Sequence, residues 1–242
     1  LEVYSMTASD EILAKTPDAL ITGNAVVKII QNCVPAIKDA WVLNNRDFDY
    51  VLSAVRIATY GDAMNVGHKC KKCSNEDTFS FPLQRLLDHL NSVEPNYETV
   101  VDGFVFRLRP LTYRELVTNQ QITMKVRREL YKISREEEKL NSRDRDGLLD
   151  QLYEEINSQT KEVICSIVSE ITTPDGDKES NPIFIKDFLL NSEGKYFDAV
   201  QEVYSRNSEK LAIPRTDVQC SECGHESSVA PILDYTSFFS KP

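Results

Sequence analysis

Apolar residues recur at three- and four-residue steps along most of the chain, a spacing that places them on one face of a helix. The first such stretch carries Val27, Ile30, Val34 and Ile37, and Pro35 should kink or end it because proline lacks the amide hydrogen. The same spacing predicts further helices over residues 47–60, 83–90, 112–138, 146–171, 184–190 and 196–211.

Polar residues mark the ends of several of these helices. Residues 7–11 offer side-chain oxygens that can cap a short helix, since its first amides lack partners. Thr112 and Glu115 fit the capping-box pattern at the start of a long helix. Gly61 suits a C-terminal cap. The two long central helices, joined by a charged turn over residues 135–145, predict an antiparallel helix hairpin.

Shorter stretches alternate between apolar and polar residues, as half-buried strands do. They cover residues 104–109, residues 1–6 as an edge strand, and the segments around two cysteine turns within 64–81 and 217–232. Together with the helices they predict an α+β fold that is mostly helical.

Four of the six cysteines form two pairs with CxxC spacing, Cys70 with Cys73 and Cys220 with Cys223. A tight turn can present the two thiolates of such a pair to one metal ion. Two such turns complete the tetrahedral four-sulfur shell that structural zinc prefers. We therefore expect a small zinc-ribbon-like β module, made of two sequence-distant hairpins, that holds structural Zn²⁺ through these four metal ligands.

The two pairs are unusually far apart, since 146 residues lie between Cys73 and Cys220. The expected organisation has three parts. Residues 1–63 form an N-terminal strand and helices, residues 64–82 plus 215–234 form the split zinc-ribbon-like module, and residues 83–214 form a helical insertion with the long helix hairpin. Closing so long a loop should stabilise the fold, although the effect grows only slowly with loop length.

Other interpretations of the cysteines stay open. Each pair could be a redox motif, although neither has a thioredoxin-like strand–turn–helix context, and the two hairpins need not meet. His68 and His225 flank the pairs and could replace a thiolate, but four sulfurs already fill the shell, which disfavours catalytic zinc. Cys33 and Cys165 fall in apolar helical patterns and are expected in the core.

Composition narrows the class of protein. With 41% hydrophobic residues, a chain of 242 residues can bury a real core, and its net charge of -10 argues against a nucleic-acid binder. No apolar run approaches the roughly 18–20 residues that span a bilayer. Although the chain begins at Leu1 rather than Met, we expect an intracellular product of a reducing compartment, without a membrane or nucleic-acid partner.

Motifs of the common catalytic classes are missing from the sequence: there is no nucleophile elbow, Walker loop, dinucleotide fingerprint or HExxH. The acidic runs at 136–138 and 154–155 fit solvated helix faces, so we do not expect an enzyme. The aromatic C-terminal segment, residues 235–239, either folds back onto the core or docks on a partner.

Several segments resemble one protein family. They are residues 6–13 (MTASDEIL), 16–20 (TPDAL), 29–35 (IIQNCVP), 47–49 (DFD), 56–61 (RIATYG), the pair Cys70 and Cys73, and residues 106–113 (FRLRPLTY). With these segments the chain resembles the baseplate hub and hub-assembly proteins of contractile-tailed, T-even-like bacteriophages. The resemblance covers roughly the first half of the chain, and the zinc prediction rests on this sequence alone.

The resemblance implies a non-enzymatic virion or assembly protein of the tail baseplate, made in the host cytoplasm. Its partners would be other tail proteins, such as hub, tail-tube or wedge components, in a multi-protein assembly. A second class also stays open: a zinc-ribbon regulator that binds nucleic acid or a polymerase, against which the acidic charge argues.

Overall fold

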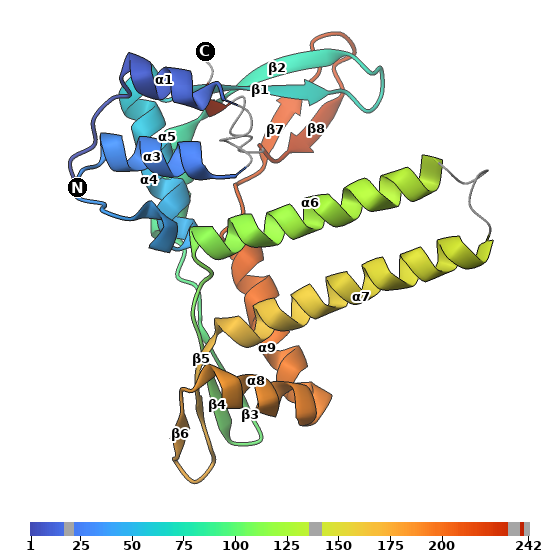
Figure 1. Cartoon of the computed structure of the whole chain (residues 1–242). Coiled ribbons are helices and arrows are strands. Elements are labelled where there is room, and N and C mark those ends of the chain that lie inside the picture. The colour runs from blue at the N-terminus through green and yellow to red at the C-terminus, as the bar shows by residue number, and fades with distance from the viewer. Residues whose placement is uncertain (17–21, 136–141, 232–237, 240–242) are drawn as a thin grey trace. The chain divides into compact units, whose positions relative to one another are not determined.

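The computed structural model describes residues 1–16, 22–135, 142–231 and 238–239, with the backbone alone for 142–144 (Figure 1). The fold is α+β and mostly helical, as the sequence predicted. The chain divides into two compact units, one made of Leu1–Glu94 with Lys210–Pro242 and the other of Pro95–Glu209.

The first unit combines helices with two antiparallel β-hairpins. Its elements are α1 (Ala8–Ala14), α3 (Asn24–Cys33), η1 (Ala40–Val42), α4 (Asn45–Tyr60), β1 (Ala63–Lys69), β2 (Glu76–Pro82), α5 (Leu83–Ser92), β7 (Thr216–Gln219) and β8 (Glu226–Val229). Helix α4 contacts α3 and α5, and α1 contacts α3. The side chains of Phe48, Leu52 and Val55 along α4 are fully buried, which gives this unit its core.

Helix ends in the first unit follow from local chemistry. Thr7 and Asp10 form a reciprocal capping box at the start of α1. Helix α3 ends at Cys33, earlier than the apolar spacing alone suggests, because Pro35 biases Val34 away from the helical conformation. Gly61 ends α4 with a positive φ of 88°, as its position after the helix predicted.

The expected edge strand at residues 1–6 is wrong. This segment is extended but forms no strand ladder. Its amides bond instead to helical neighbours: Tyr4 N donates to the carbonyl of Cys33, and Met6 N donates to Thr59 Oγ1 at 3.0 Å. Because no strand lies beside it, the loose alternation of these residues reflects packing on helices.

The C-terminal aromatic residues that the structure describes are buried within the chain. Phe238 is 1% exposed and Phe239 5%, and their rings meet edge to face at 5.3 Å. The guanidinium of the buried Arg56 lies 5.6 Å from the Phe238 ring centre. For these two residues the structure supports the first interpretation, folding back onto the core; residues 235–237 of that segment lie outside the described part of the chain.

The second unit combines an antiparallel sheet with a long helix hairpin and two further helices. Its elements are β3 (Glu98–Val101), β4 (Phe104–Leu108), α6 (Tyr113–Arg135), α7 (Ser142–Ile167), β5 (Val168–Thr172), β6 (Lys178–Glu179), α8 (Pro182–Asn191) and α9 (Gly194–Lys210). The strand order is β3-β4-β5-β6. The central strands and α7, α8 and α9 bury one apolar cluster that includes Phe106, Ile171, Ile185 and Val200.

The long helix predicted over residues 146–171 ends early. Helix α7 stops at Ile167, and the next five residues form β5, which pairs antiparallel with β4. Val168 and Ile171 are both buried, and their separation of three positions is the spacing of a helix face, so the apolar pattern alone favours a longer helix. The backbone hydrogen bonds with β4 favour the strand instead.

The predicted helix hairpin is present as α6 and α7, which run side by side in opposite directions (Figure 1). Among the side chains that the structure describes away from the sheet, Val126, Ile133 and Leu152 are buried between them, with Leu130 and Leu149 half-buried beside them. Across the described residues, no helix combines the length and the apolar character needed to cross a membrane.

Candidate metal centre

Two short β-hairpins of the first unit present the four paired cysteines. Strands β1 and β2 pair up to Lys69 and Glu76, and Cys70 follows directly. Strands β7 and β8 pair up to Gln219 and Glu226, and Cys220 follows directly. Each CxxC pair therefore occupies the turn of a hairpin whose register is fixed by its strands.

The two cysteine turns repeat the same backbone hydrogen bonds. The amide of Cys70 donates to the carbonyl of Asn75, and the amide of Ser74 donates back to the carbonyl of Cys70, at 2.8 and 2.9 Å. The second turn has the same two bonds at 3.0 Å each, one from Cys220 to the carbonyl of His225 and one from Gly224 to the carbonyl of Cys220. The two halves of the site are thus built alike, although 146 residues separate them.

The residue after the second cysteine has a positive φ in both turns, 62° at Ser74 and 66° at Gly224. Glycine adopts this conformation without strain, whereas a serine there costs roughly 1–2 kcal/mol. Since the strain at Ser74 must be offset by other interactions, the shape of the first turn is held by its surroundings.

The structure brings the four sulfur atoms together. Cys70 Sγ lies 3.7 Å from Cys223 Sγ, and Cys73 Sγ lies 3.6 Å from Cys220 Sγ. All four lie within 4.8 Å of one another. A tetrahedral ion with metal–sulfur bonds of about 2.3 Å requires sulfur–sulfur distances of about 3.8 Å. A disulfide would require about 2.05 Å, so the arrangement fits a shared metal ion and does not fit paired disulfides.

Backbone amides favour the thiolate in the first turn. The amides of Cys73 and Lys72 point at Cys70 and lower the pKa of its thiol to about 6. The Asn75 amide favours the Cys73 thiolate too, but a hydrogen bond with Cys223, burial and a hydrogen bond with Cys220 outweigh it and raise the Cys73 pKa to about 12. Four adjacent thiolates repel one another, and a bound cation would remove that repulsion.

Side chains beyond the cysteines join the two hairpins. Asp77 accepts two hydrogen bonds from Ser221, one from its amide at 3.0 Å and one from its hydroxyl at 2.6 Å, and these lower the pKa of the Asp77 carboxyl. On the other side, Ser227 Oγ lies 2.9 Å from His68 Nε2. Asp77 and Ser227 lie on short strands and Ser221 lies in the second cysteine turn. Polar residues in such places carry no distinctive pattern, so the sequence did not indicate these contacts.

The remaining candidate residues lie elsewhere. His68 is engaged with Ser227, and neither His68 nor His225 belongs to the four-sulfur group. Cys33 and Cys165 are buried in the two separate units, and burial raises the pKa of both thiols, to about 11 for Cys33. Four sulfurs fill a tetrahedral shell and leave no open position, so such a centre would act structurally.

The fold and this centre define a class: an α+β protein whose two β-hairpins, far apart in sequence, close one four-cysteine centre. The chain belongs to the T4 bacteriophage base plate protein family, whose model matches residues 4–240. No curated protein and no solved structure matches it at a significant level.

Membership of this family indicates the general function of the chain. The chain is a structural protein of a phage baseplate, which places it in the virion tail in association with other tail proteins. The family resemblance expected from the first half of the sequence is therefore confirmed, and it extends over nearly the whole chain.

Proposed function

We propose that this chain acts in the hub region of the baseplate, as a structural or assembly component that works through protein contacts, and that a structural zinc ion holds its first unit together. The baseplate family supplies the setting. The hub assignment draws on the segments that resemble hub and hub-assembly proteins, among them residues 29–35, 56–61 and 106–113.

One observation carries the zinc proposal: four cysteine sulfurs lie within 4.8 Å of one another at the turns of two similar hairpins. Cys70, Cys73, Cys220 and Cys223 would be the ligands. The donor set is soft and complete, which suits Zn²⁺ in a structural role. The ion would tie β1 and β2 to β7 and β8, because one pair of ligands comes from each hairpin.

The proposed mode of action is docking and not catalysis. The centre has no open coordination position, and the sequence carries no motif of a common catalytic class. We therefore propose hub, tail-tube or wedge proteins as direct partners, reached after synthesis in the host cytoplasm.

Native mass spectrometry of the purified chain tests the zinc proposal. We expect the 27.6 kDa chain to carry one zinc ion, and a chelator to remove it together with the folded charge states. A chain that folds without metal, or one with the four cysteines in disulfides, would contradict the proposal.

Co-expression with the hub, tail-tube and wedge proteins of the same phage tests the hub proposal separately. We expect the chain to co-purify with hub proteins. Co-purification with wedge proteins alone, or with none of the three sets, would overturn the hub assignment and leave the zinc result unaffected.

A further inference from the structure

Helix α7 presents an apolar stripe that its own unit covers only in part. Leu149, Tyr153, Ile156, Thr160 and Val163 follow one another at alternating steps of four and three residues, the spacing of a coiled-coil seam. Val163 packs against the core of the second unit. Tyr153, in contrast, is 56% exposed, and Ile156 is 37% exposed. The stripe is therefore covered at Val163, half-covered at Leu149, and most exposed at Tyr153 between them.

Helix α6 also exposes large apolar side chains. Met124 is 53% exposed and Tyr131 is 57% exposed, and their separation of seven positions places both on the same side of the helix. The guanidinium of Arg135 lies 4.9 Å from the Tyr131 ring centre, so that ring also has a cationic neighbour. Exposed apolar residues grouped in this way are typical of an interaction surface.

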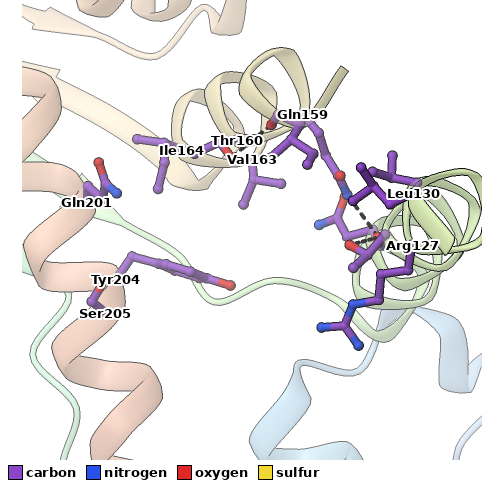
Figure 2. Close-up of a pocket in the computed structure, with 13 residues that line it drawn as sticks. Arg127, Leu130, Gln159, Thr160, Val163, Ile164, Gln201, Tyr204 and Ser205 are labelled. Atoms are coloured by element: carbon purple, nitrogen blue, oxygen red, sulfur yellow. Dashed lines mark hydrogen bonds between the residues drawn. The ribbon is translucent and has the colours of Figure 1, made fainter. Parts of the chain in front are cut away.

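The face is indented at its base. A pocket of about 540 Å³ lies where α6, α7 and α9 meet, and its lining includes Leu130, Ile156, Val163 and Tyr204. Figure 2 shows Tyr204 extending from α9 into this pocket, with Leu130 and Val163 pointing toward it from the hairpin. An indented surface of this kind can receive side chains from a neighbouring helix.

The two helices carry opposite charge. Helix α6 has six basic and two acidic residues, whereas α7 has six acidic and three basic residues. One pair is used inside the hairpin, since Lys125 Nζ lies 2.8 Å from Glu155 Oε1. Arg127 and Arg128 on α6, and Asp150 and Glu154 on α7, are exposed and form no ion pair within the described part of the chain.

We propose that this hairpin pairs with the hairpin of a second copy of the chain, the basic helix α6 of each copy lying on the acidic helix α7 of the other. A second copy fits because it carries a helix of opposite charge for each helix of the first: its acidic α7 matches α6, and its basic α6 matches α7. The contact is self-complementary, as a two-fold interface requires. The result is a four-helix bundle in which every neighbouring helix is antiparallel.

The available surface is large enough for such a contact. Helix α6 has 23 residues and α7 has 26. At about 1.5 Å per residue and about 10 Å per helix width, the hairpin face measures roughly 700 Å². A stable interface buries about 800 Å² per partner. The hairpin face, with a small contribution from α9, reaches that size.

Light scattering during size-exclusion chromatography of the zinc-loaded full chain tests the proposal. We expect a mass twice that of the 27.6 kDa chain at micromolar concentrations, falling toward one chain as salt rises. Reversing the charge of α6 with Arg127→Glu and Arg128→Glu, or that of α7 with Asp150→Lys and Glu154→Lys, should weaken dimerisation at least about tenfold.

The combined variant with all four reversals is the decisive one. It restores opposite charge between the two helices, so dimerisation should return if α6 meets α7 of the other copy. Glu202→Lys with Glu209→Lys on α9 is the matched control, because helical spacing places both residues on the side of α9 away from Tyr204. It changes the net charge as much as the α7 reversal does and should leave the dimer intact.

Three outcomes would overturn the proposal. The wild-type chain could be monomeric at all concentrations, the dimer could survive both reversals, or the combined variant could stay monomeric while its circular dichroism remains native. A monomer that binds a co-expressed tail protein through the same four residues would assign the face to that partner and not to a second copy.

Discussion

The two cysteine hairpins and the α6–α7 hairpin both lack a large apolar core, and they are stabilised in different ways. Each is too thin to bury more than a small core of its own. The β-hairpins bring four sulfurs within 4.8 Å of one another, a geometry suited to a shared ion. Among its described side chains, the helix hairpin buries three between its helices and leaves two tyrosines exposed, Tyr131 and Tyr153.

This difference separates two sources of stability. In the cysteine module, a few strong ligand bonds would replace a core, so stability should depend on metal and very little on apolar contacts. In the helix hairpin, stability comes from a small apolar cluster and from its caps. The comparison predicts that metal removal and core truncation affect different parts of the molecule.

The largest expected effect is loss of a metal ligand. Cys220→Ala should abolish zinc binding and unfold the β-hairpins, because structural zinc contributes about 10–16 kcal/mol of apparent binding free energy. Cys165→Ala is the matched control: this cysteine is equally buried, at 5% against 4% exposed, but lies in the other unit. The control should retain one zinc ion and lose at most about 2 kcal/mol of unfolding free energy.

Zinc content per chain and hydrogen exchange of the β-strand amides measure both outcomes. If Cys220→Ala kept a full zinc ion, or if both variants changed exchange equally, the metal-closed description of the module would be wrong.

Truncation of the helix hairpin should be the next largest effect. Leu152→Ala removes one of the three residues buried between α6 and α7 and should cost about 2–5 kcal/mol of local unfolding free energy. Leu148→Ala, one turn earlier on α7 and 40% exposed, should cost below about 1 kcal/mol. Faster exchange of the α6 and α7 amides, with unchanged exchange in β1 and β7, is the expected result. Equal effects of the two variants would contradict the assigned core.

A smaller effect should come from the side chains that join the cysteine hairpins. Asp77→Ala removes the acceptor of two hydrogen bonds from Ser221, so we expect zinc affinity to fall by roughly tenfold to a hundredfold. Asp217→Ala, an exposed carboxylate on β7, is the control and should leave affinity unchanged. Competition with a chromophoric chelator measures both constants. An unchanged constant for Asp77→Ala would show that the hydrogen bonds between Asp77 and Ser221 do not help to hold the metal ligands.

Local patterns in the sequence were enough to predict most helices. Apolar spacing located α4, α5, α6, α8 and α9, and residue chemistry located their ends at Gly61 and Thr112. Such signals succeed because they depend on residues three or four positions apart. The end of α7 at Ile167 and the start of β5 at Val168 could not be predicted in this way. The strand depends on pairing with β4, which lies about 60 residues earlier in the chain.

The strand β3 was missed although a local signal existed. Asp102 and Gly103, both with positive φ, form the two-residue turn that joins β3 to β4, and an Asp-Gly pair is a strong hairpin signal. At the centre, the spacing of the cysteines indicated the four candidate ligands. It could not indicate that Asp77 meets Ser221, because that contact exists only after two hairpins 144 residues apart come together.

The smallest expected effect concerns the cap of α6 and is pH-dependent. Hydrogen bonds from Arg109 and from Thr112 lower the pKa of Glu115 to about 2. Because this folded-state pKa lies below the ordinary value of 4.5, Glu115 stabilises the fold fully above about pH 4.5, and the contribution is lost as the pH falls to about 2. Since the Glu115 side chain is 32% exposed and that of Arg109 39%, solvent screening limits the contribution to about 1–2 kcal/mol.

Glu115→Gln should therefore be less stable than wild type at pH 7 and equally stable near pH 2. Taking the difference between the two proteins at each pH, from urea unfolding of the second unit, cancels the titration of all other groups, including the cysteines. Glu98→Gln, in a pair with Arg107 whose side chains are about half exposed, should show a difference below about 0.5 kcal/mol at every pH. A Glu115→Gln difference that stays constant from pH 7 to pH 2 would mean that the negative charge of Glu115 contributes nothing to the stability of the second unit.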